Sequence, residues 1–211
     1  MKRKKTDARA QIMHAADTLF ARQGYRGTSL DEILDAARVS RSNLYYHFRN
    51  KRTLLREVLA LWVEEARQEL LPAMKNAGLS APERIRAMIR ALARRIARIG
   101  PECGCPVLNL TIECSGPGSP RTPELDRFFA GLQAAIEDCL RKGIHSEEVR
   151  ADLDARRTAR LVLAAMQGAA VMARKAGTIR PVQECGQELF HLLNEPSTRA
   201  RKGNLRVRAA S

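Results

Sequence analysis

The sequence has few aromatic residues, few histidines and no long apolar run, and each shortage excludes a class of site. Aromatic residues make up 4% of the chain, and the histidines number four. No histidine lies at ligand spacing from another histidine or from a cysteine, whereas structural zinc takes four closely spaced ligands, so we predict no metal site and no cofactor. No apolar run approaches the roughly 20 residues of a membrane-spanning helix, which argues against a membrane protein.

The five cysteines are an odd number, and the first ten residues are basic without the apolar core of a signal peptide. These two features predict a cytoplasmic protein whose cysteines stay reduced as thiols. With 211 residues, 45% of them apolar and 28% charged, the chain has the composition of a soluble globular protein with one large or two small domains.

Acidic residues are scarce at the two ends of the chain. Residues 1–60 hold 13 Lys and Arg against 6 Asp and Glu, and residues 196–211 hold 5 against none. Residues 61–195 hold the remaining 19 against 17, so most of the net charge of +14 lies at the ends. Basic ends favour binding to the phosphates of double-stranded DNA, because neutralised phosphates release condensed counterions. The segment 196–211 is also poor in apolar residues, which predicts a basic, disordered tail.

Apolar residues recur at helical spacing almost from end to end, and this periodicity predicts an all-α fold. Within residues 29–48, two short helices are expected on either side of a tight turn. Ser29 and Glu32 form a capping box for the first of them, and Ser40 can cap the second. The pattern predicts an N-terminal three-helix domain over residues 6–66 that contains a helix-turn-helix motif at about 29–48.

The part of the chain from 67 to 195 is predicted to be a helical bundle that binds a ligand and forms the dimer. Its helices are expected from Ser80 to Gly100, at 106–113, from Thr122 to Gly143, at about 154–176 and at 181–194. Small side chains on one of these helices would let a neighbouring helix approach closely. They suit a four-helix interface between two copies of the chain and comprise Ala164, Ala165, Gly168 and Ala169.

The second helix of the motif carries polar and aromatic side chains where a DNA-reading helix needs them. With Leu44 and Phe48 turned inward, its other side chains face outward, so that an arginine can bind a guanine edge, an asparagine an adenine edge and tyrosine hydroxyls the phosphates. The free amides that begin the first helix suit a further phosphate. The predicted DNA-contacting residues are Thr28, Arg41, Ser42, Asn43, Tyr45, Tyr46, His47 and Lys51.

The segment from Thr6 to about Ala66 closely resembles the DNA-binding domain of the TetR family of repressors. The resemblance is carried by ADTLFARQGYRGTSLDEILDAARVSRSNLYYHFRNKRTLL, which covers residues 16–55. It implies an all-helical homodimer with a divergent ligand-binding C-terminal domain, and it assigns DNA contacts to the positions named above. Asn43 stands where threonine is common, so the operator sequence cannot be taken from relatives. Arg38 stands where glycine is usual, and we expect a slightly remodelled turn because a left-handed L-residue costs roughly 1–2 kcal/mol.

Thiols gather in the segment ECGCPVLNLTIEC, residues 102–114. Cys105 precedes Pro106 and is therefore predicted at a helix N-terminus, where the helix dipole and free amides stabilise a thiolate. The run from Gly104 to Asn109 resembles a Gly-Cys-x-x-x-Asn segment in a branch of the family that includes repressors of electrophile and aldehyde detoxification. Cys105 is the candidate sensing residue, with Cys103 and Cys114 as partners for a disulfide. The alternative is a buried cysteine that acts as a small hydrophobic residue.

These features together predict a sequence-specific transcriptional repressor that binds a near-palindromic operator as a homodimer. A small-molecule or electrophile inducer would release it from DNA by shifting the population of domain arrangements. Two alternatives stay open. The first is a thiol-dependent enzyme that uses Cys105, for which the sequence offers no base nearby. The second is a constitutive DNA-binding protein without a ligand.

Overall fold

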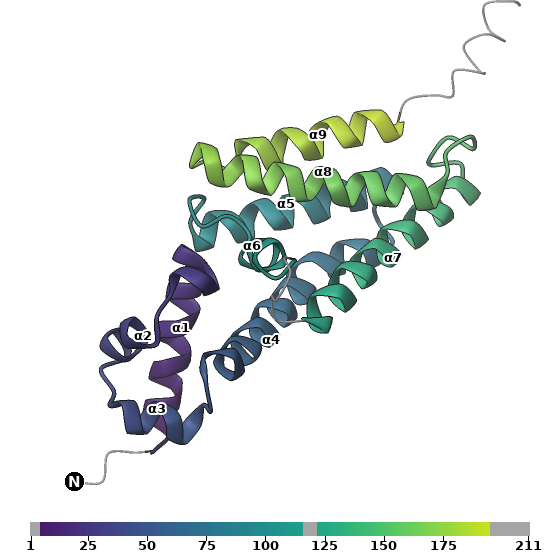
Figure 1. Ribbon diagram of the computed structural model, residues 1–211. Coiled ribbons are helices and arrows are strands. Elements are labelled where there is room, and N and C mark those ends of the chain that lie inside the picture. Colours follow the sequence, from purple (N-terminus) through teal and green to yellow (C-terminus); the bar gives the residue numbers. More distant parts are fainter. Residues whose placement is uncertain (1–4, 116–121, 195–211) are drawn as a thin grey trace, which may run out of the picture.

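The computed structural model describes residues 5–115 and 122–194, and within these ranges the chain is helical without any β-strand. The predicted all-α fold is therefore confirmed. The elements are α1 (Lys5–Gly27), α2 (Leu30–Ala37), α3 (Arg41–His47), α4 (Lys51–Leu70), the 3₁₀ helix η1 (Leu71–Lys75), α5 (Ala81–Ile99), α6 (Pro106–Glu113), α7 (Pro123–His145), α8 (Ala155–Ala176) and α9 (Arg180–Asn194) (Figure 1). The tail predicted over 196–211 lies outside the described residues.

The first three helices and the start of α4 form one end of the molecule (Figure 1). α1 contacts α2, α3 and α4, and together they enclose side chains with no solvent exposure, among them Ile12, Ile33, Leu44, Phe48 and Leu54. The capping box opens α2 as predicted, because the Ser29 hydroxyl accepts the amide of Glu32 at 3.1 Å and the Glu32 carboxylate accepts the amide of Ser29 at 2.6 Å.

The turn between α2 and α3 keeps the left-handed residue of an ordinary helix-turn-helix. Arg38 has φ 54° and ψ 42°, and its amide donates to the carbonyl of Asp35 at 3.2 Å. The expected remodelling of this turn is therefore wrong. The chain accepts a strain of about 1 kcal/mol at Arg38 in this conformation.

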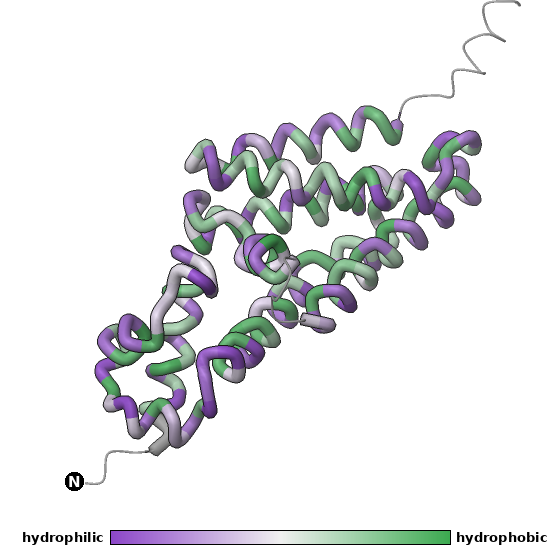
Figure 2. The backbone as a smooth tube through the Cα atoms, viewed as in Figure 1, coloured by the Kyte–Doolittle hydropathy of each residue, from purple (hydrophilic) through white to green (hydrophobic). Residues whose placement is uncertain are grey.

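The second half of α4 and the helices α5 to α9 form the other end of the molecule. α5 packs against α9 and α7, and α8 packs against α7 and α9. Figure 2 shows hydrophobic and hydrophilic residues following one another along these helices, as expected for helices that bury one face. α4 is continuous through residue 67, where the boundary between the domains was predicted, so the two domains share one helix.

The helices of the second domain begin and end close to their predicted bounds, except at Gly143. α7 continues to His145, so the expectation that Gly143 ends it is wrong. A Cβ at Gly143 would lie 2.5 Å from the Cβ of Ala81, so this glycine permits the close packing of α7 against the start of α5. Among the helices that the structure describes, none is long and apolar enough to cross a membrane.

Candidate functional site

α3 turns one face into the first domain and the other face outward, as predicted. Leu44 and Phe48 are completely buried, whereas 49% of Tyr45 and 65% of Tyr46 is exposed. The side chains of Arg41, Ser42 and Asn43 are exposed on the same outer side, and His47 is half-buried with its ring 4.9 Å from that of Tyr46. The predicted reading residues therefore lie together on one accessible surface.

The guanidinium of Arg41 forms an ion pair with the carboxylate of Asp31 on α2. The two side chains are 61% and 68% exposed, so water screens the pair and it contributes little to stability. Such a pair can hold the guanidinium near the outer face of α3 and can be exchanged for a base edge or a phosphate at small cost.

Thr28 differs from the other predicted DNA-contacting residues because its side chain is buried. Only 1% of the residue is exposed, and its hydroxyl donates to the carbonyl of Gly24 at 2.7 Å. Gly24 has φ 80° and marks the kink at the end of α1. The hydroxyl therefore fixes this kink, and any phosphate contact at Thr28 has to come from the backbone.

Lys51 begins α4 and lies at the junction of the two domains. Its ammonium group is 4.3 Å from the centre of the Tyr25 ring. Burial lowers the pKa of Lys51, while the carboxylates of Glu113 and Glu32 act in the opposite direction. The lysine is half-buried, so the flat side of Tyr25 supports the ammonium group at the domain surface.

The second domain contains a cavity of about 30 Å³, which is lined by residues of α4, α5, α6, α7 and α8 and is partly open to solvent. A single water needs roughly 10–15 Å³ of such space, so only a very small molecule fits without movement of the walls. Most of the lining is aliphatic or aromatic. The lining residues are Ala66, Leu70, Leu92, Arg95, Cys105, Val107, Leu108, Phe128, Phe129, Leu132, Leu163, Met166, Gln167 and Ala170.

Cys105 lines this cavity from the N-cap position of α6, so its predicted place at a helix N-terminus is confirmed. Burial raises the pKa of the Cys105 thiol; the amides of Leu108 and Val107 and the positive charge of Arg95 oppose this without reversing it. The expectation of a stabilised thiolate is therefore wrong, because the helix end acts inside an apolar wall.

The other two candidate thiols also favour the protonated form, since burial raises the pKa of Cys103 and of Cys114. None of the cysteines forms a disulfide within the part of the chain that the structure describes. Cys103 lies in a separate cleft of about 450 Å³ between the domains, not in the apolar cavity. The structure therefore does not gather the three sensing candidates around one cavity.

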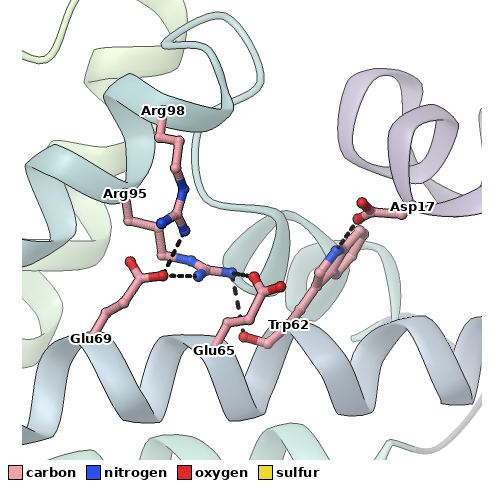
Figure 3. A network of polar contacts seen from close by, with 6 residues as sticks. All are labelled: Asp17, Trp62, Glu65, Glu69, Arg95 and Arg98. Carbon is pink, nitrogen blue, oxygen red and sulfur yellow. Dashed lines mark hydrogen bonds and ion pairs between the residues drawn. The ribbon is translucent and has the colours of Figure 1, made fainter. Parts of the chain in front are cut away.

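A polar network connects the two domains beside the cavity (Figure 3). Arg95 on α5 is 1% exposed, and its guanidinium donates to Glu69 at 3.0 Å, to Glu65 at 3.2 Å and to the carbonyl of Trp62 at 3.4 Å. The indole of Trp62 in turn donates to Asp17 on α1 at 2.6 Å. Sequence reasoning missed this network, because Arg95 stands beside apolar helix positions and its partners come from distant parts of the chain.

α6 makes a second connection between the domains. At its C-terminal end, Glu113 accepts the amide of Arg26 at 2.9 Å. A Cβ at Gly24 would lie only 2.1 Å from the Glu113 carboxylate, so the side chain lies directly on this glycine. One short helix therefore touches the cavity at Cys105 and the first domain at Glu113.

α8 and α9 present apolar side chains to the outside of the single chain. The exposed fraction is 61% for Leu161, 62% for Met172 and 55% for Leu192. An added Cβ at Gly168 would meet nothing within 4 Å. The small-residue position on α8 is therefore open on its outer side, next to exposed apolar residues that favour contact with another chain.

The fold and the outer face of α3 define a helix-turn-helix DNA-binding regulator with a separate helical domain. Residues 12–58 match the model of the bacterial regulatory proteins of the tetR family, and residues 81–189, just over half of the chain, match the tetracyclin repressor-like C-terminal domain. The chain belongs to the TetR family and is a DNA-binding transcriptional repressor. The members of this family are regulators and not enzymes, so the alternative of a thiol-dependent enzyme is rejected.

Individual relatives agree with this assignment over most of the chain. The repressor DhaR of Mycobacterium sp. (strain GP1) is 23% identical over 92% of this chain and 96% of its own. The regulatory protein TetR from Rhodobacter sphaeroides is 25% identical, with a TM-score of 0.77 over 87% of this chain and 97% of its own. A cysteine mutant of CifR, solved with 26-base-pair operator DNA, is 20% identical with a TM-score of 0.70, over 86% and 94% of the two chains.

Proposed function

We propose that the protein binds a near-palindromic operator as a homodimer and is released when a small, mainly apolar inducer enters the cavity of the second domain. The observation that carries this proposal is the path of α6. It begins at Cys105 in the cavity wall and ends at Glu113 on the kinked end of α1. A ligand that displaces the cavity wall would therefore act on the DNA-binding domain through this one short helix.

Operator reading is assigned to the exposed face of α3. Arg41 and Asn43 would read base edges, and Ser42, Tyr45, Tyr46 and His47 would contact phosphates or neighbouring bases. The amide at Thr28 and the ammonium group of Lys51 would bind phosphates at the two sides of the motif. In a dimer the two α3 helices would sit in successive major grooves about 34–36 Å apart, or at a multiple of this spacing.

The dimer is assigned to α8 and α9, which carry exposed apolar side chains around the open Gly168 position. Close packing of these two helices on those of a second copy would cover the side chains in a four-helix interface. The interface would also fix the separation of the two reading helices, so that inducer binding in either chain changes the fit to the operator.

The nature of the inducer follows from the cavity. Its small volume and apolar wall favour a compact, neutral molecule, which has to push α6 outward to fit. The polar network around Arg95 would respond to the same movement, because Arg95 lines both the cavity and the cleft between the domains. Movement of α6 and α5 together would shift α1 through Glu113 and through the contact of Trp62 with Asp17.

A small electrophile is a second candidate inducer, because Cys105 lies in the cavity wall. The thiolate sulfur would add to the β-carbon of an unsaturated aldehyde, and the α-carbon would take up a proton from water. The raised pKa of Cys105 makes this reaction slow in the cavity. Cys103 and Cys114 would act only after movement that brings the sulfur atoms together.

The test uses an operator selected from random double-stranded DNA and fluorescence anisotropy of the labelled duplex. Small neutral compounds and acrolein should each be titrated into the complex, with wild type and Cys105→Ser in parallel. Release of wild type by acrolein but not of Cys105→Ser identifies the covalent route, and equal release of both by a neutral compound identifies the apolar ligand. An operator complex that no compound dissociates would favour a constitutive DNA-binding protein.

A further inference from the structure

A groove of about 410 Å³ lies between α5 and α9, apart from the apolar cavity and from the cleft between the domains. Its volume is in the range of small-molecule sites. Figure 1 places α5 and α9 at the opposite end of the molecule from α3. The groove is lined by Arg86, Ile89, Arg90, Ala93, Arg94, Ile179, Val182, Gln183, Gly186 and Gln187.

Three arginines form a row along one wall of this groove. Arg86, Arg90 and Arg94 are four residues apart on α5 and therefore lie above one another on the same helix face. At a rise of about 1.5 Å per residue, their Cα atoms are spaced about 6 Å apart and span about 12 Å. Like charges at this spacing repel one another, so the row destabilises α5 unless an anion binds to it.

No carboxylate forms an ion pair with the row within the part of the chain that the structure describes. The ion pairs of α5 involve Arg95 and Arg98, not Arg86, Arg90 or Arg94. Glu83 stands three residues before Arg86, and its carboxylate accepts the amide and the hydroxyl of Ser80 in the helix cap. These hydrogen bonds are the main cause that lowers the pKa of Glu83; the charge of Arg86 adds to the effect without forming an ion pair.

The wall opposite the arginines is neutral and polar. α9 lines the groove with Gln183 and Gln187, whereas the adjacent acids Glu184 and Glu188 are not part of the lining. Glu184 is instead paired with Arg180. The side of α9 that faces the arginines therefore offers amide groups that can bind an anion and places its carboxylates elsewhere.

The floor of the groove is apolar, and the arginine at one end of the row is held by an aromatic ring. Ile89 and Val182 are fully buried below the arginines, and a Cβ at Gly186 would lie 3.0 Å from Ile89, so the glycine lets α9 approach α5 closely. The guanidinium of Arg86 lies 3.8 Å from the centre of the Phe190 ring. This cation–π contact orients one end of the row before any ligand binds.

We propose that the α5–α9 groove is a second ligand site, which binds an elongated small organic polyanion. Phosphate or carboxylate groups of the ligand would pair with the three arginines, and its less polar part would lie on the apolar floor between the arginines and glutamines. Guanidinium groups suit both kinds of anion, because they donate two parallel hydrogen bonds. This site is independent of the inducer cavity, and the proposal does not rest on the response of the repressor to an inducer.

Isothermal titration calorimetry of the full chain, at constant ionic strength, tests the site with adenosine triphosphate, inorganic tripolyphosphate and citrate. Wild type should bind at least one of them with one site per chain. The double variant Arg90→Gln/Arg94→Gln should weaken that binding by at least about ten-fold, because two charge-assisted contacts are lost. Both substitutions are on exposed residues. They relieve the repulsion within the row, so circular dichroism should show a variant that melts at or slightly above the temperature of wild type.

Two matched controls separate the groove from general attraction to a basic protein. Arg127→Gln/Arg141→Gln removes two positive charges from α7, where each arginine is paired with a glutamate of its own helix, and Arg41→Ala removes a charge from the DNA-reading face. Both controls should bind the polyanion as wild type does. Three results would each overturn the proposal: wild type that binds none of the three anions, a groove variant that binds as tightly as wild type, or controls that lose as much affinity as the groove variant.

Discussion

The two domains use charge in opposite ways. In the first domain the charges proposed to contact DNA lie on the surface, where Arg41 pairs with the exposed Asp31. In the second domain Arg95 is buried and holds Glu65, Glu69 and the carbonyl of Trp62 next to an apolar cavity. The comparison teaches that the first domain keeps its charges accessible from outside, which suits the binding of DNA. The second domain places its central charge at a buried junction of helices, which suits the coupling that we propose.

The largest expected effect is on operator binding, and it should follow from loss of the dimer. Because an added Cβ at Gly168 meets nothing within 4 Å in the single chain, Gly168→Leu should clash only with a partner chain. We expect monomers in analytical ultracentrifugation and a loss of operator affinity of about 100-fold or more, since one half-site remains. Gly131→Leu is the matched control, because its Cβ also meets nothing within 4 Å and it lies on α7. A dimeric Gly168→Leu protein would place the interface elsewhere.

Replacement of the buried Arg95 should lower the free energy of unfolding more than replacement of an exposed arginine does. Arg95→Ala leaves Glu65 and the carbonyl of Trp62 without this donor, whereas Glu69 keeps its ion pair with Arg98. This remaining pair and the partial exposure of the two carboxylates moderate the cost. We expect the free energy of unfolding to fall by about 2–3 kcal/mol in urea titrations. Arg94→Ala, at the exposed neighbouring position, should change it by less than about 0.5 kcal/mol. Similar values for the two variants would show that the network does not stabilise the fold.

Substitutions on the exposed face of α3 should have the opposite outcome to Arg95→Ala: they should weaken operator binding and leave the free energy of unfolding unchanged. Arg41→Ala and Tyr46→Ala should each weaken operator binding by about 1–3 kcal/mol per half-site, measured by fluorescence anisotropy, while the urea midpoint stays the same. Arg127→Ala on α7 provides a control with the same loss of charge. If both α3 variants bind the operator as tightly as wild type, another surface reads the DNA.

The smallest expected effect concerns the half-buried thiol of Cys105. Burial raises the pKa of Cys105 above its unfolded value, so the folded state binds the proton more tightly. Its contribution to stability is complete below the ordinary cysteine pKa of about 8.5 and is lost as the pH rises through the raised value. The difference in unfolding free energy between wild type and Cys105→Ser should therefore shrink from pH 8 to pH 10 under reducing conditions. A difference that grows over this range would contradict the raised pKa.

The two domains also differ in how much of them the sequence predicts. The inward positions of Leu44 and Phe48, the capping box at Ser29 and the outer face of α3 follow from local spacing, and the structure agrees with all of them. Local patterns also place α6 at residues 106–113. These predictions succeed because each depends on residues within one or two helical turns.

Features that depend on distant residues could not be predicted in this way. The sequence places Cys105 correctly at a helix start, but the raised pKa comes from walls that four other helices supply. The burial of the Thr28 side chain could not be predicted either, because its hydroxyl donates to the carbonyl of Gly24 at the kink of α1. Glu113 and Arg95 carry no local signal at all, since their partners are 87 and 26 to 33 residues away along the chain.

Coupling between the cavity and the DNA-reading face is tested most directly by filling the cavity with a side chain. Ala170 lines the cavity and is 2% exposed, so Ala170→Leu should push on α6 as an inducer would. The account predicts a folded dimer with operator affinity lowered by about ten-fold in fluorescence anisotropy. The control Ala97→Leu, at an exposed position of α5, should bind as wild type does. A folded, dimeric Ala170→Leu protein with unchanged operator affinity would contradict the coupling of the two domains.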